Sequence, residues 1–268
     1  MGGARTRLFV LLGRPVGHSL SPAMQNAAFQ ALGLDAVYAA LDCAEEDVAA
    51  FARTLAAGGG GGNATVPHKQ VLASALAHPS PRVARLGSAN VFWGDGGALA
   101  GECTDVDGVL DALKALEALT TATWLVVGTG GSARAVVGAA IERGARVAVS
   151  SRTTERALEF SAWARGQGAE LGLLAEAEVV INATPLGLQE HSALPIALAM
   201  VPRAKWALDL VYRRGETDWV RLCRAGGLRA MDGREVLVAQ GAAALERWFP
   251  KVRAPREVMR AAVARALA

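Results

Sequence analysis

The stretch that decides the fold is Trp124-Leu-Val-Val-Gly-Thr-Gly-Gly-Ser-Ala133, near the middle of the chain. Its apolar start predicts a buried strand, and the glycines that follow predict a tight turn. Residues 130–143 then carry a helical pattern that begins at the turn. A G-x-G-x-x-[GA] pattern between a strand and a helix is typical of a dinucleotide-binding turn.

Each small residue in this turn has its own chemical reason. Gly128 permits the tight turn, Gly130 lets the backbone approach a pyrophosphate, and Ala133 allows the helix to pack closely on the strand. A chance match is easy in a chain with 30 glycines, so a glycine-rich turn without a ligand is the alternative. The flanking strand and helix favour the cofactor site, whose residues would be Gly128, Thr129, Gly130, Gly131, Ser132 and Ala133.

The end of the next strand, residues 146–150, indicates which dinucleotide binds. An NAD site usually has an acidic residue there for the ribose 2′-hydroxyl. This chain instead has Ser151, Arg152, Thr153 and Arg156, which offer hydroxyl and guanidinium donors to a 2′-phosphate. The sequence therefore favours NADP over NAD, with two ordinary exposed arginines as the alternative.

Strand and helix patterns alternate along the whole chain of 268 residues. This alternation predicts an α/β fold with mainly parallel sheets that are covered on both faces. Strands are expected at 7–13, 36–41, 62–66, 88–93, 98–102, 124–128, 146–150, 178–182 and 204–210. Helices are expected at 22–32, 44–57, from 68, and at 106–119, 130–143, 154–167, 219–225, 235–249 and 255–267. Gly58–Gly62 is expected to be an elongated loop, and residues 94–97 the turn of a hairpin.

Composition excludes several classes of protein. Hydrophobic residues make up 52% of the chain and the net charge is +3, which excludes a disordered protein and gives no basic stripe for nucleic acid. No apolar run is long enough for a membrane helix, and the first residues lead directly into a strand without a signal peptide. Cys43, Cys103 and Cys223 form no CxxC pair, so we expect neither a metal site nor disulfides. We therefore expect a cytoplasmic protein.

Nine motifs stand in order along the chain. They are Gly13-Arg-Pro-Val-Gly-His-Ser-Leu-Ser-Pro22, Asn63-Ala-Thr-Val-Pro-His-Lys69, Gly87-Ser-Ala-Asn90, Cys103-Thr-Asp105, Gly128–Ala133, Ser151-Arg-Thr153, Asn182-Ala-Thr-Pro-Leu-Gly187, Asp209-Leu-Val-Tyr212 and Val238-Ala-Gln240. In this order they resemble the shikimate dehydrogenase family over nearly the whole chain. The resemblance implies an oxidoreductase of aromatic amino-acid and chorismate biosynthesis that interconverts 3-dehydroshikimate and shikimate with NADP(H).

The same resemblance implies the roles of individual residues. Lys69 and Asp105 would be catalytic, and further cofactor contacts would come from Ala183, Thr184, Leu210 and Gly233. Substrate would be held by Ser19, Ser21, Thr65, Asn90, Tyr212 and Gln240, of which the two serines would take the carboxylate. Ser21, followed by Pro22, also has the simpler interpretation of a helix N-cap.

Lys69 is one of only four lysines in the chain. A lysine with a lowered pKa can give a proton to the alkoxide that hydride transfer creates and can take it back, whereas arginine cannot. Asp105 could orient Lys69 and accept a hydrogen bond from a substrate hydroxyl. The alternative for this pair is a surface salt bridge.

Three positions depart from the family pattern. Val91 stands where threonine is usual, Cys103 where asparagine is usual, and Gln25 where histidine is often found. Losing polar groups at 91 and 103 favours a paralogue that acts on quinate or an amino-analogue, or weak activity, as an alternative. A non-catalytic NADP-binding protein on the same fold is a separate alternative, and the intact Lys69–Asp105 pair is evidence against it.

We expect two domains with the active site in the cleft between them. Residues 1–105 would bind substrate, joined by C-terminal helices from residue 236 that return to pack on them. Residues 106–235 would form a Rossmann-like NADP-binding domain. The expected partner is a small-molecule substrate, and monomer and homodimer are both compatible with the sequence.

Overall fold

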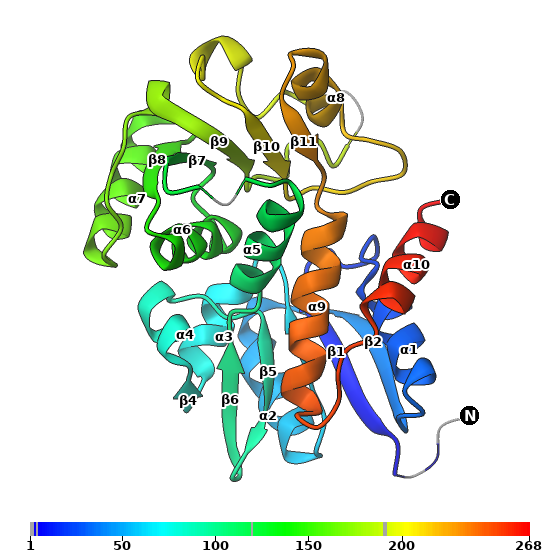
Figure 1. The fold of residues 1–268 in the computed structure, drawn as a ribbon. Coiled ribbons are helices and arrows are strands. Elements are labelled where there is room, and N and C mark those ends of the chain that lie inside the picture. The colour runs from blue at the N-terminus through cyan, green and yellow to red at the C-terminus, as the bar shows by residue number, and fades with distance from the viewer. Residues whose placement is uncertain (1–2, 4, 119, 190–191) are drawn as a thin grey trace. The chain divides into compact units, whose positions relative to one another are not determined.

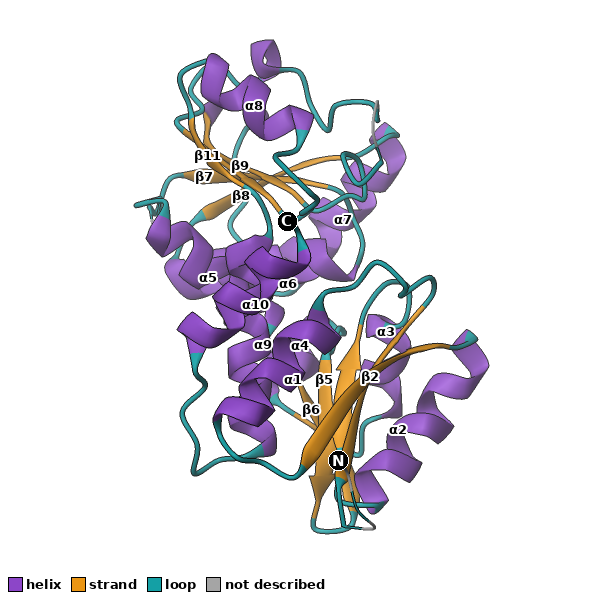
Figure 2. Ribbon diagram, turned by 90° about the vertical axis from the view of Figure 1, so that its right-hand side faces the viewer, coloured by secondary structure: helices purple, strands orange, loops and turns teal. Residues whose placement is uncertain are grey.

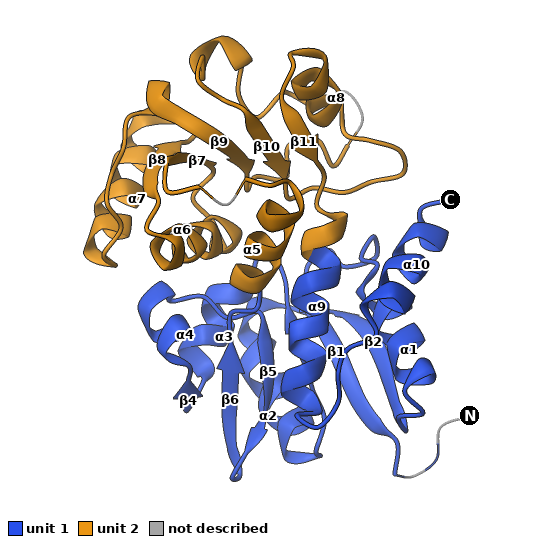
Figure 3. Cartoon of the chain, viewed as in Figure 1, with its two compact units in different colours: residues 1–104, 237–268 blue, residues 105–236 orange. Residues whose placement is uncertain are grey.

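The computed structural model describes residues 3, 5–118, 120–189 and 192–268. The chain divides into two compact units, residues 1–104 with 237–268 (unit 1) and residues 105–236 (unit 2), coloured separately in Figure 3. The second boundary falls inside one helix, α9 (Arg234–Trp248), whose first turn belongs to unit 2. Strands and helices alternate in both units (Figure 1), as the sequence predicts.

Unit 1 contains a six-stranded sheet with the order β2-β1-β3-β5-β6-β4. The strands are β1 (Arg7–Gly13), β2 (Ala36–Asp42), β3 (Gly61–Ala64), β4 (His78–Pro79), β5 (Val91–Asp95) and β6 (Ala98–Glu102). All run parallel except β5, which is antiparallel to β3 and forms the expected hairpin with β6. The carboxyl ends of β1, β3 and β6 therefore share one edge of the sheet with the start of β5.

Helices cover both faces of this sheet. They are α1 (Ser21–Ala31), α2 (Val48–Ala57), α3 (Lys69–Ala75), α4 (Pro81–Leu86), most of α9 and α10 (Arg256–Ala266). In Figure 2, α2 and α3 lie on one side and α1 and α4 on the other. The C-terminal helices pack on this unit, because α10 contacts α1 and the Trp248 ring lies 4.7 Å from that of Phe9. These contacts join the end of the chain to its first strand.

The expected strand at 62–66 is observed as β3 (Gly61–Ala64), which begins one residue earlier, at a glycine expected in the loop, and ends two residues earlier. A Cβ on Gly62 would lie 2.2 Å from the carbonyl oxygen of Val10, and one on Gly61 would lie 2.5 Å from that of Phe92. Both distances are far below van der Waals contact. These glycines let β3 fit between β1 and β5, which local sequence patterns do not reveal.

Other differences lie at short elements and helix starts. A 3-10 turn, Glu45–Asp47, precedes α2, and the short elements β4, α4 and β11 (Arg229–Met231) were not predicted. Ser21 is not an N-cap, because α1 begins at Ser21 itself, Leu20 occupies the cap position and no side chain caps the helix. The Ser21 hydroxyl is thus not used for helix capping.

Unit 2 contains a five-stranded parallel sheet with the order β11-β10-β9-β7-β8. Its strands besides β11 are β7 (Thr123–Val127), β8 (Arg146–Ser150), β9 (Ala177–Asn182) and β10 (Trp206–Asp209). Its helices are α5 (Asp105–Ala115), α6 (Gly131–Arg143), α7 (Thr154–Gly166) and α8 (Asp218–Ala225), with 3-10 turns at Leu174–Glu176 and Leu198–Met200. From β7 the chain goes to β8 on one side and then to β9 on the other. Such a reversal is where open parallel sheets bind nucleotides.

Among the described residues, no helix is long and apolar enough to cross a membrane. The three cysteines are buried and free.

Candidate active site

The glycine turn of unit 2 has the geometry that its sequence predicts. Gly128 has φ +114°, and a Cβ there would lie 3.0 Å from the carbonyl oxygen of Ala183. Its N–H donates to the carbonyl oxygen of Ser150 at 2.8 Å. The turn is therefore held between the ends of β8 and β9, and only glycine fits at its first position.

Gly130 is different, because nothing in the protein requires a glycine there. It is the N-cap residue of α6, it is exposed, and a Cβ on it would meet no protein atom within 4 Å. The open space lies at a helix N-terminus, where backbone N–H groups favour an anion. The turn thus fits a pyrophosphate that approaches the backbone.

The polar cluster after β8 is exposed. Thr153 caps α7, since its Oγ1 accepts a hydrogen bond from the Arg156 N–H at 3.4 Å. In the described part of the chain, neither Arg152 nor Arg156 has a carboxylate partner. Two unneutralised guanidinium groups near the glycine turn fit a dianionic 2′-phosphate better than a ribose hydroxyl.

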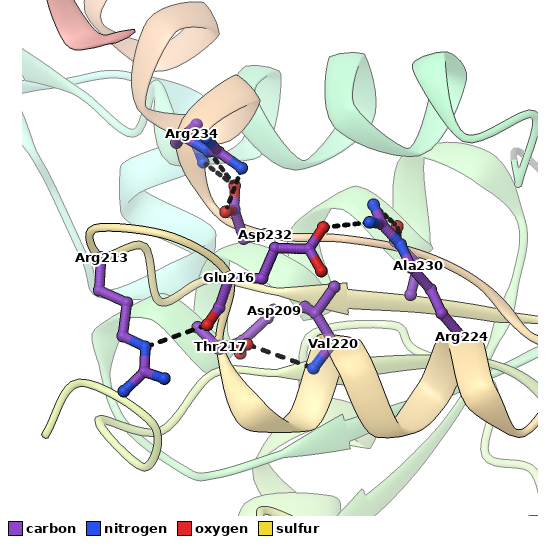
Figure 4. A network of polar contacts seen from close by, with 9 residues as sticks. All are labelled: Asp209, Arg213, Glu216, Thr217, Val220, Arg224, Ala230, Asp232 and Arg234. Carbon is purple, nitrogen blue, oxygen red and sulfur yellow. Dashed lines mark hydrogen bonds and ion pairs between the residues drawn. The ribbon is translucent and has the colours of Figure 1, made fainter. Parts of the chain in front are cut away.

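A buried polar network joins the ends of β9 and β10, and Figure 4 shows the part of it that lies between Asp209 and Arg234. The Asp209 carboxylate accepts hydrogen bonds from Asn182 Nδ2 at 2.8 Å, Thr217 Oγ1 at 2.7 Å and the Val211 N–H at 3.1 Å. Burial raises the pKa of Asp209 to about 6, although all three hydrogen bonds favour the charged form. Nearby, Asp232 pairs with Arg234 at 2.8 Å. The sequence showed Asp209 only as part of a motif and gave no sign of this network.

In unit 1 the sequence-predicted substrate residues follow the strand ends that share one edge of the sheet. Ser19 and Ser21 come after β1, and the Ser21 N–H donates to Ser19 Oγ at 3.3 Å. Thr65 follows β3 and lies against Gly13, where a Cβ would be 2.4 Å from Thr65 Cγ2. Gly13 thus allows the ends of β1 and β3, and the side chains that follow them, to lie close together.

Lys69 is the first residue of α3 and is buried. Its carbonyl oxygen accepts the Ala89 N–H at 2.9 Å, which ties α3 to the segment that carries Asn90. The preceding residue, His68, is buried too, and its Nε2 donates to the carbonyl oxygen of Cys43 at 2.9 Å. These two contacts fix the backbone from which Lys69 projects.

Asn90 and Gln240 are brought together although 150 residues separate them in sequence. Asn90 Nδ2 donates to Gln240 Oε1 at 3.1 Å, while Asn90 Oδ1 accepts the Thr104 N–H at 2.6 Å. Gln240 Nε2 donates to the carbonyl oxygen of Leu237 at 2.8 Å. Because a backbone N–H can only donate and a carbonyl only accept, both amide orientations are determined.

Two buried side chains, Tyr38 and Asn63, are hydrogen-bonded in series to the backbone of Asn90. The Tyr38 hydroxyl donates to Asn63 Oδ1 at 2.7 Å, and Asn63 Nδ2 donates to the Asn90 carbonyl oxygen at 2.9 Å. Sequence reasoning missed both residues and Thr104. The available signal was a polar residue, Asn63, in a short strand that is otherwise built of glycine and alanine.

The residues that depart from the family pattern lie in the packed interior. Val91 and Cys103 are wholly buried, and the Cys103 backbone is held by Glu102 Oε1 at 2.8 Å and by Arg82 at 3.3 Å. Gln25 Nε2 donates to the carbonyl oxygen of Gly241 at 2.9 Å, which joins α1 to α9. Gln25 therefore has a packing role in this chain.

Two of the predicted catalytic and substrate-binding residues lie in unit 2. Asp105 is the first residue of α5, directly after Thr104, and Tyr212 is partly buried in the loop after β10. Ala183, Thr184 and Leu210 follow β9 and β10, while Gly233 packs so closely that a Cβ would lie 2.3 Å from the Leu210 carbonyl oxygen. Among the described residues no group of histidine, cysteine and carboxylate side chains could hold a metal ion.

A Rossmann-like unit with a dinucleotide turn, together with a unit that presents a lysine, amides and hydroxyls, defines the class of dinucleotide-dependent α/β oxidoreductases. Residues 11–92 match the model of the shikimate dehydrogenase substrate binding domain, and residues 233–264 that of the shikimate 5'-dehydrogenase C-terminal domain. The chain belongs to the shikimate dehydrogenase family.

Individual relatives match over almost their full length. Shikimate dehydrogenase (NADP(+)) from Halobacterium salinarum is 39% identical over 262 residues, which cover 96% of this chain and 98% of the relative. The enzyme of the same name from Microcystis aeruginosa is 36% identical over 277 residues, 97% of this chain and 96% of the relative. The crystal structure of shikimate 5-dehydrogenase from Thermus thermophilus in complex with NADP(H) and shikimate has a TM-score of 0.87 at 36% identity, covering 97% of this chain and 99% of that one.

Proposed function

We propose that this protein catalyses the reversible NADP-dependent reduction of 3-dehydroshikimate to shikimate. The observation that carries the proposal is the edge of the unit 1 sheet, where Lys69 is tied through Ala89 to the oriented Asn90–Gln240 pair. Reduction of a ketone on a polyhydroxylated ring needs a proton donor, which a lysine provides, and hydrogen-bonding groups for the ring hydroxyls, which the amides provide. The family relationship over nearly the whole chain supports the same reaction.

In the proposed mechanism NADPH supplies the hydride. Lys69 donates a proton to the oxygen that becomes the alkoxide, and in the reverse direction it accepts that proton. Asp105 orients the Lys69 ammonium group and accepts a hydrogen bond from a substrate hydroxyl. The backbone around Lys69 is held in place by hydrogen bonds, which supports the role of Lys69 as proton donor. Proton transfer requires the donor to lie within hydrogen-bond reach of the oxygen.

The remaining site residues of the proposal bind the substrate. Ser19 and Ser21 hold the carboxylate, with Tyr212 near it, and Thr65, Asn90 and Gln240 hold ring hydroxyls. The Ser21 hydroxyl is suited to this because it does not cap α1, and the Ser19 oxygen, which accepts the Ser21 N–H, keeps its own hydroxyl proton to donate. We assign substrate binding to unit 1 and NADP binding to unit 2.

The cofactor contacts follow the strand order of unit 2. The turn from Gly128 to Ala133 would hold the pyrophosphate, and Ser151, Arg152, Thr153 and Arg156 would hold the 2′-phosphate. Ala183, Thr184, Leu210 and Gly233 would contact the other half of the dinucleotide. Support for the 2′-phosphate site comes from Arg152 and Arg156, neither of which pairs with a carboxylate of the residues that the structure describes.

We further propose that the protein acts in the cytoplasm on small molecules alone, as a monomer or a homodimer. Three buried free cysteines suit a reducing compartment. The near balance of charge, 28 basic against 25 acidic residues, gives no reason to invoke a nucleic acid partner.

The test is turnover by the purified full chain, followed through the ultraviolet absorbance of NADPH. We expect NADP+ to be reduced with shikimate, and much more slowly when NAD+ replaces NADP+ or quinate replaces shikimate. Faster turnover with quinate would contradict the substrate assignment. NADP+ binding without turnover of any of these acids would contradict the enzymatic assignment.

A further inference from the structure

Asp209 stands at the end of β10 and is wholly buried. Figure 4 shows it beside Thr217, one of its three hydrogen-bond partners. Its Oδ1 accepts from Asn182 Nδ2 and from the Val211 N–H, and its Oδ2 accepts from Thr217 Oγ1. Every one of these partners is a neutral donor. Among the described residues no cationic side chain pairs with this carboxylate, since Arg213 pairs with Asp218 and Arg234 with Asp232.

Asn182 extends the network into the loop after β9. Its Nδ2 also donates to the carbonyl oxygen of Leu186 at 3.0 Å. Its Oδ1 accepts from the Thr184 N–H at 3.0 Å and from Thr184 Oγ1 at 2.6 Å. Asp209 and the Leu186 carbonyl oxygen together hold the Asn182 amide nitrogen, and through this amide Asp209 is connected to the backbone and the hydroxyl of Thr184.

The same carboxylate fixes the loop after β10. Val211 donates its N–H to Asp209 and accepts the Gly233 N–H at 3.0 Å. The Leu210 N–H donates to the Asn182 carbonyl oxygen, also at 3.0 Å. Thr217, the third donor, is the N-cap of α8. One buried carboxylate therefore connects both loops and the start of a helix.

The order of the strands indicates which half of the cofactor the loops after β9 and β10 face. The 2′-phosphate residues follow β8, on one side of the glycine turn after β7, whereas β9 and β10 lie on the other side. A dinucleotide that crosses the carboxyl edge of a parallel sheet puts its two halves on opposite sides of the pyrophosphate turn. The loops that Asp209 holds therefore face the nicotinamide half.

A buried carboxylate without a cationic partner is unusual as a purely structural hydrogen-bond acceptor. Burial without a cation destabilises the charged form, and the nearby Asp232 adds to this effect, so the pKa of Asp209 is raised. What a carboxylate offers is acceptance of several hydrogen bonds at once through two oxygens, with no donor of its own. That property suits a group that must hold three donors from three segments.

We propose that Asp209 is a positioning residue that, through Asn182, Val211 and Thr217, sets the two loops against the nicotinamide half of NADP. It does not touch the reacting atoms. The inference rests on the proposed function for the identity of the cofactor. It predicts that loss of Asp209 impairs the nicotinamide half of the site and spares the adenosine half.

The experiment compares Asp209→Ala with wild type in the full chain, using NADP+ and 2′,5′-ADP, which carries the 2′-phosphate but no nicotinamide. We expect the KM for NADP+ to rise about tenfold and kcat to fall, with the binding of 2′,5′-ADP unchanged within about twofold. Asp209→Asn should restore most of the activity, because its oxygen can accept from Asn182 and Val211 while its amide donates to Thr217. Asp218→Ala, a partly exposed acid on α8, is the matched control and should behave like wild type.

Three outcomes would overturn the inference. NADP+ parameters that stay unchanged in Asp209→Ala would remove the positioning role. An equal loss of 2′,5′-ADP affinity would show that Asp209 supports the whole unit and not one half of the site. An asparagine variant as impaired as the alanine variant would show that the hydrogen bonds are not what matters.

A milder variant keeps the test decisive should Asp209→Ala fail to fold. Thr217→Val removes the hydrogen bond to Oδ2 together with the one that the Val220 N–H donates to Thr217 Oγ1 at the start of α8. It should raise the KM for NADP+ about threefold with 2′,5′-ADP binding unchanged. An unchanged KM would refute the role. If wild type fails to oxidise shikimate, the proposed function fails, whereas the two binding measurements still test Asp209.

Discussion

Lys69 is the residue whose chemistry is most specific. We expect Lys69→Ala to lower kcat by about 10³-fold, because the alkoxide then has no positioned proton donor, and to leave NADP+ affinity unchanged. Lys69→Arg should be equally impaired, since a guanidinium does not release its proton. Steady-state kinetics with shikimate and an NADP+ binding titration measure both quantities.

Lys114, an exposed lysine on α5, provides the control for this prediction. Lys114→Ala should have wild-type kinetics. A Lys69→Arg variant that retains normal kcat would exclude Lys69 as the proton donor and leave it a purely electrostatic role.

Arg152 and Arg156 determine the choice of cofactor in our interpretation. Replacing both with alanine should raise the KM for NADP+ about 100-fold, because each charged hydrogen bond to the phosphate contributes about 1.5–3 kcal/mol. The KM for NAD+ should change little, since NAD+ has no 2′-phosphate. The control is Arg165→Ala, which replaces an exposed arginine in the last turn of α7, the helix that contains Arg156. Equal losses with NADP+ and NAD+ would contradict a 2′-phosphate site.

At the scale of single residues, the sequence predicted side chains whose role follows from their own chemistry. Lys69, Arg152 and Gly128 belong to this group. It did not predict Tyr38, whose role depends on a hydrogen bond to Asn63 across 25 residues of chain. Such a partnership exists only once the strands are paired, and no local pattern carries it.

The element that most constrains unit 1 is β3, which fits between β1 and β5 only with glycine at its start. Gly62→Ala should destabilise the protein by about 2–4 kcal/mol, because its Cβ would lie 2.2 Å from a backbone carbonyl oxygen that cannot move alone. Thermal or urea denaturation measures the loss. Gly166→Ala at the end of α7, where a Cβ would meet no atom within 4 Å, should be neutral or slightly stabilising. A Gly62 variant as stable as wild type would contradict the close approach of the strands.

Elements with a sustained periodic pattern were predicted within a few residues. The helix α7 and the strand β8 are examples, because their hydrophobic spacing extends over the whole element. The strands β4 and β11 are only two and three residues long, too short to show a period. Gly61 was predicted as loop because glycine favours turns in isolation, whereas here the neighbouring strands require it.

At the scale of the whole molecule, the buried Asp209 makes stability depend on pH. Its pKa in the folded state is about 6, above the unfolded value of 3.8, so the folded state binds the proton more tightly. The contribution of Asp209 is therefore most favourable below about pH 4 and falls by about 3 kcal/mol as the pH rises through 6. We expect Asp209→Asn to gain stability relative to wild type over this interval.

Denaturation of wild type and Asp209→Asn at several pH values between about 4 and 7 measures this difference. Asp218→Asn, the partly exposed acid that pairs with Arg213, is the control and should not follow the same curve. A constant difference between Asp209→Asn and wild type across the interval would contradict a raised pKa in the folded protein.

The division of α9 between the two units has a consequence for synthesis of the chain on the ribosome. Unit 2 is continuous in sequence, whereas unit 1 needs residues 237–268 to complete its core, including the packing of Trp248 against Phe9. Domains generally fold as units while the chain emerges. Unit 2 is therefore the first that can finish folding, and the N-terminal strands keep an exposed apolar surface until residues 237–268 have been translated.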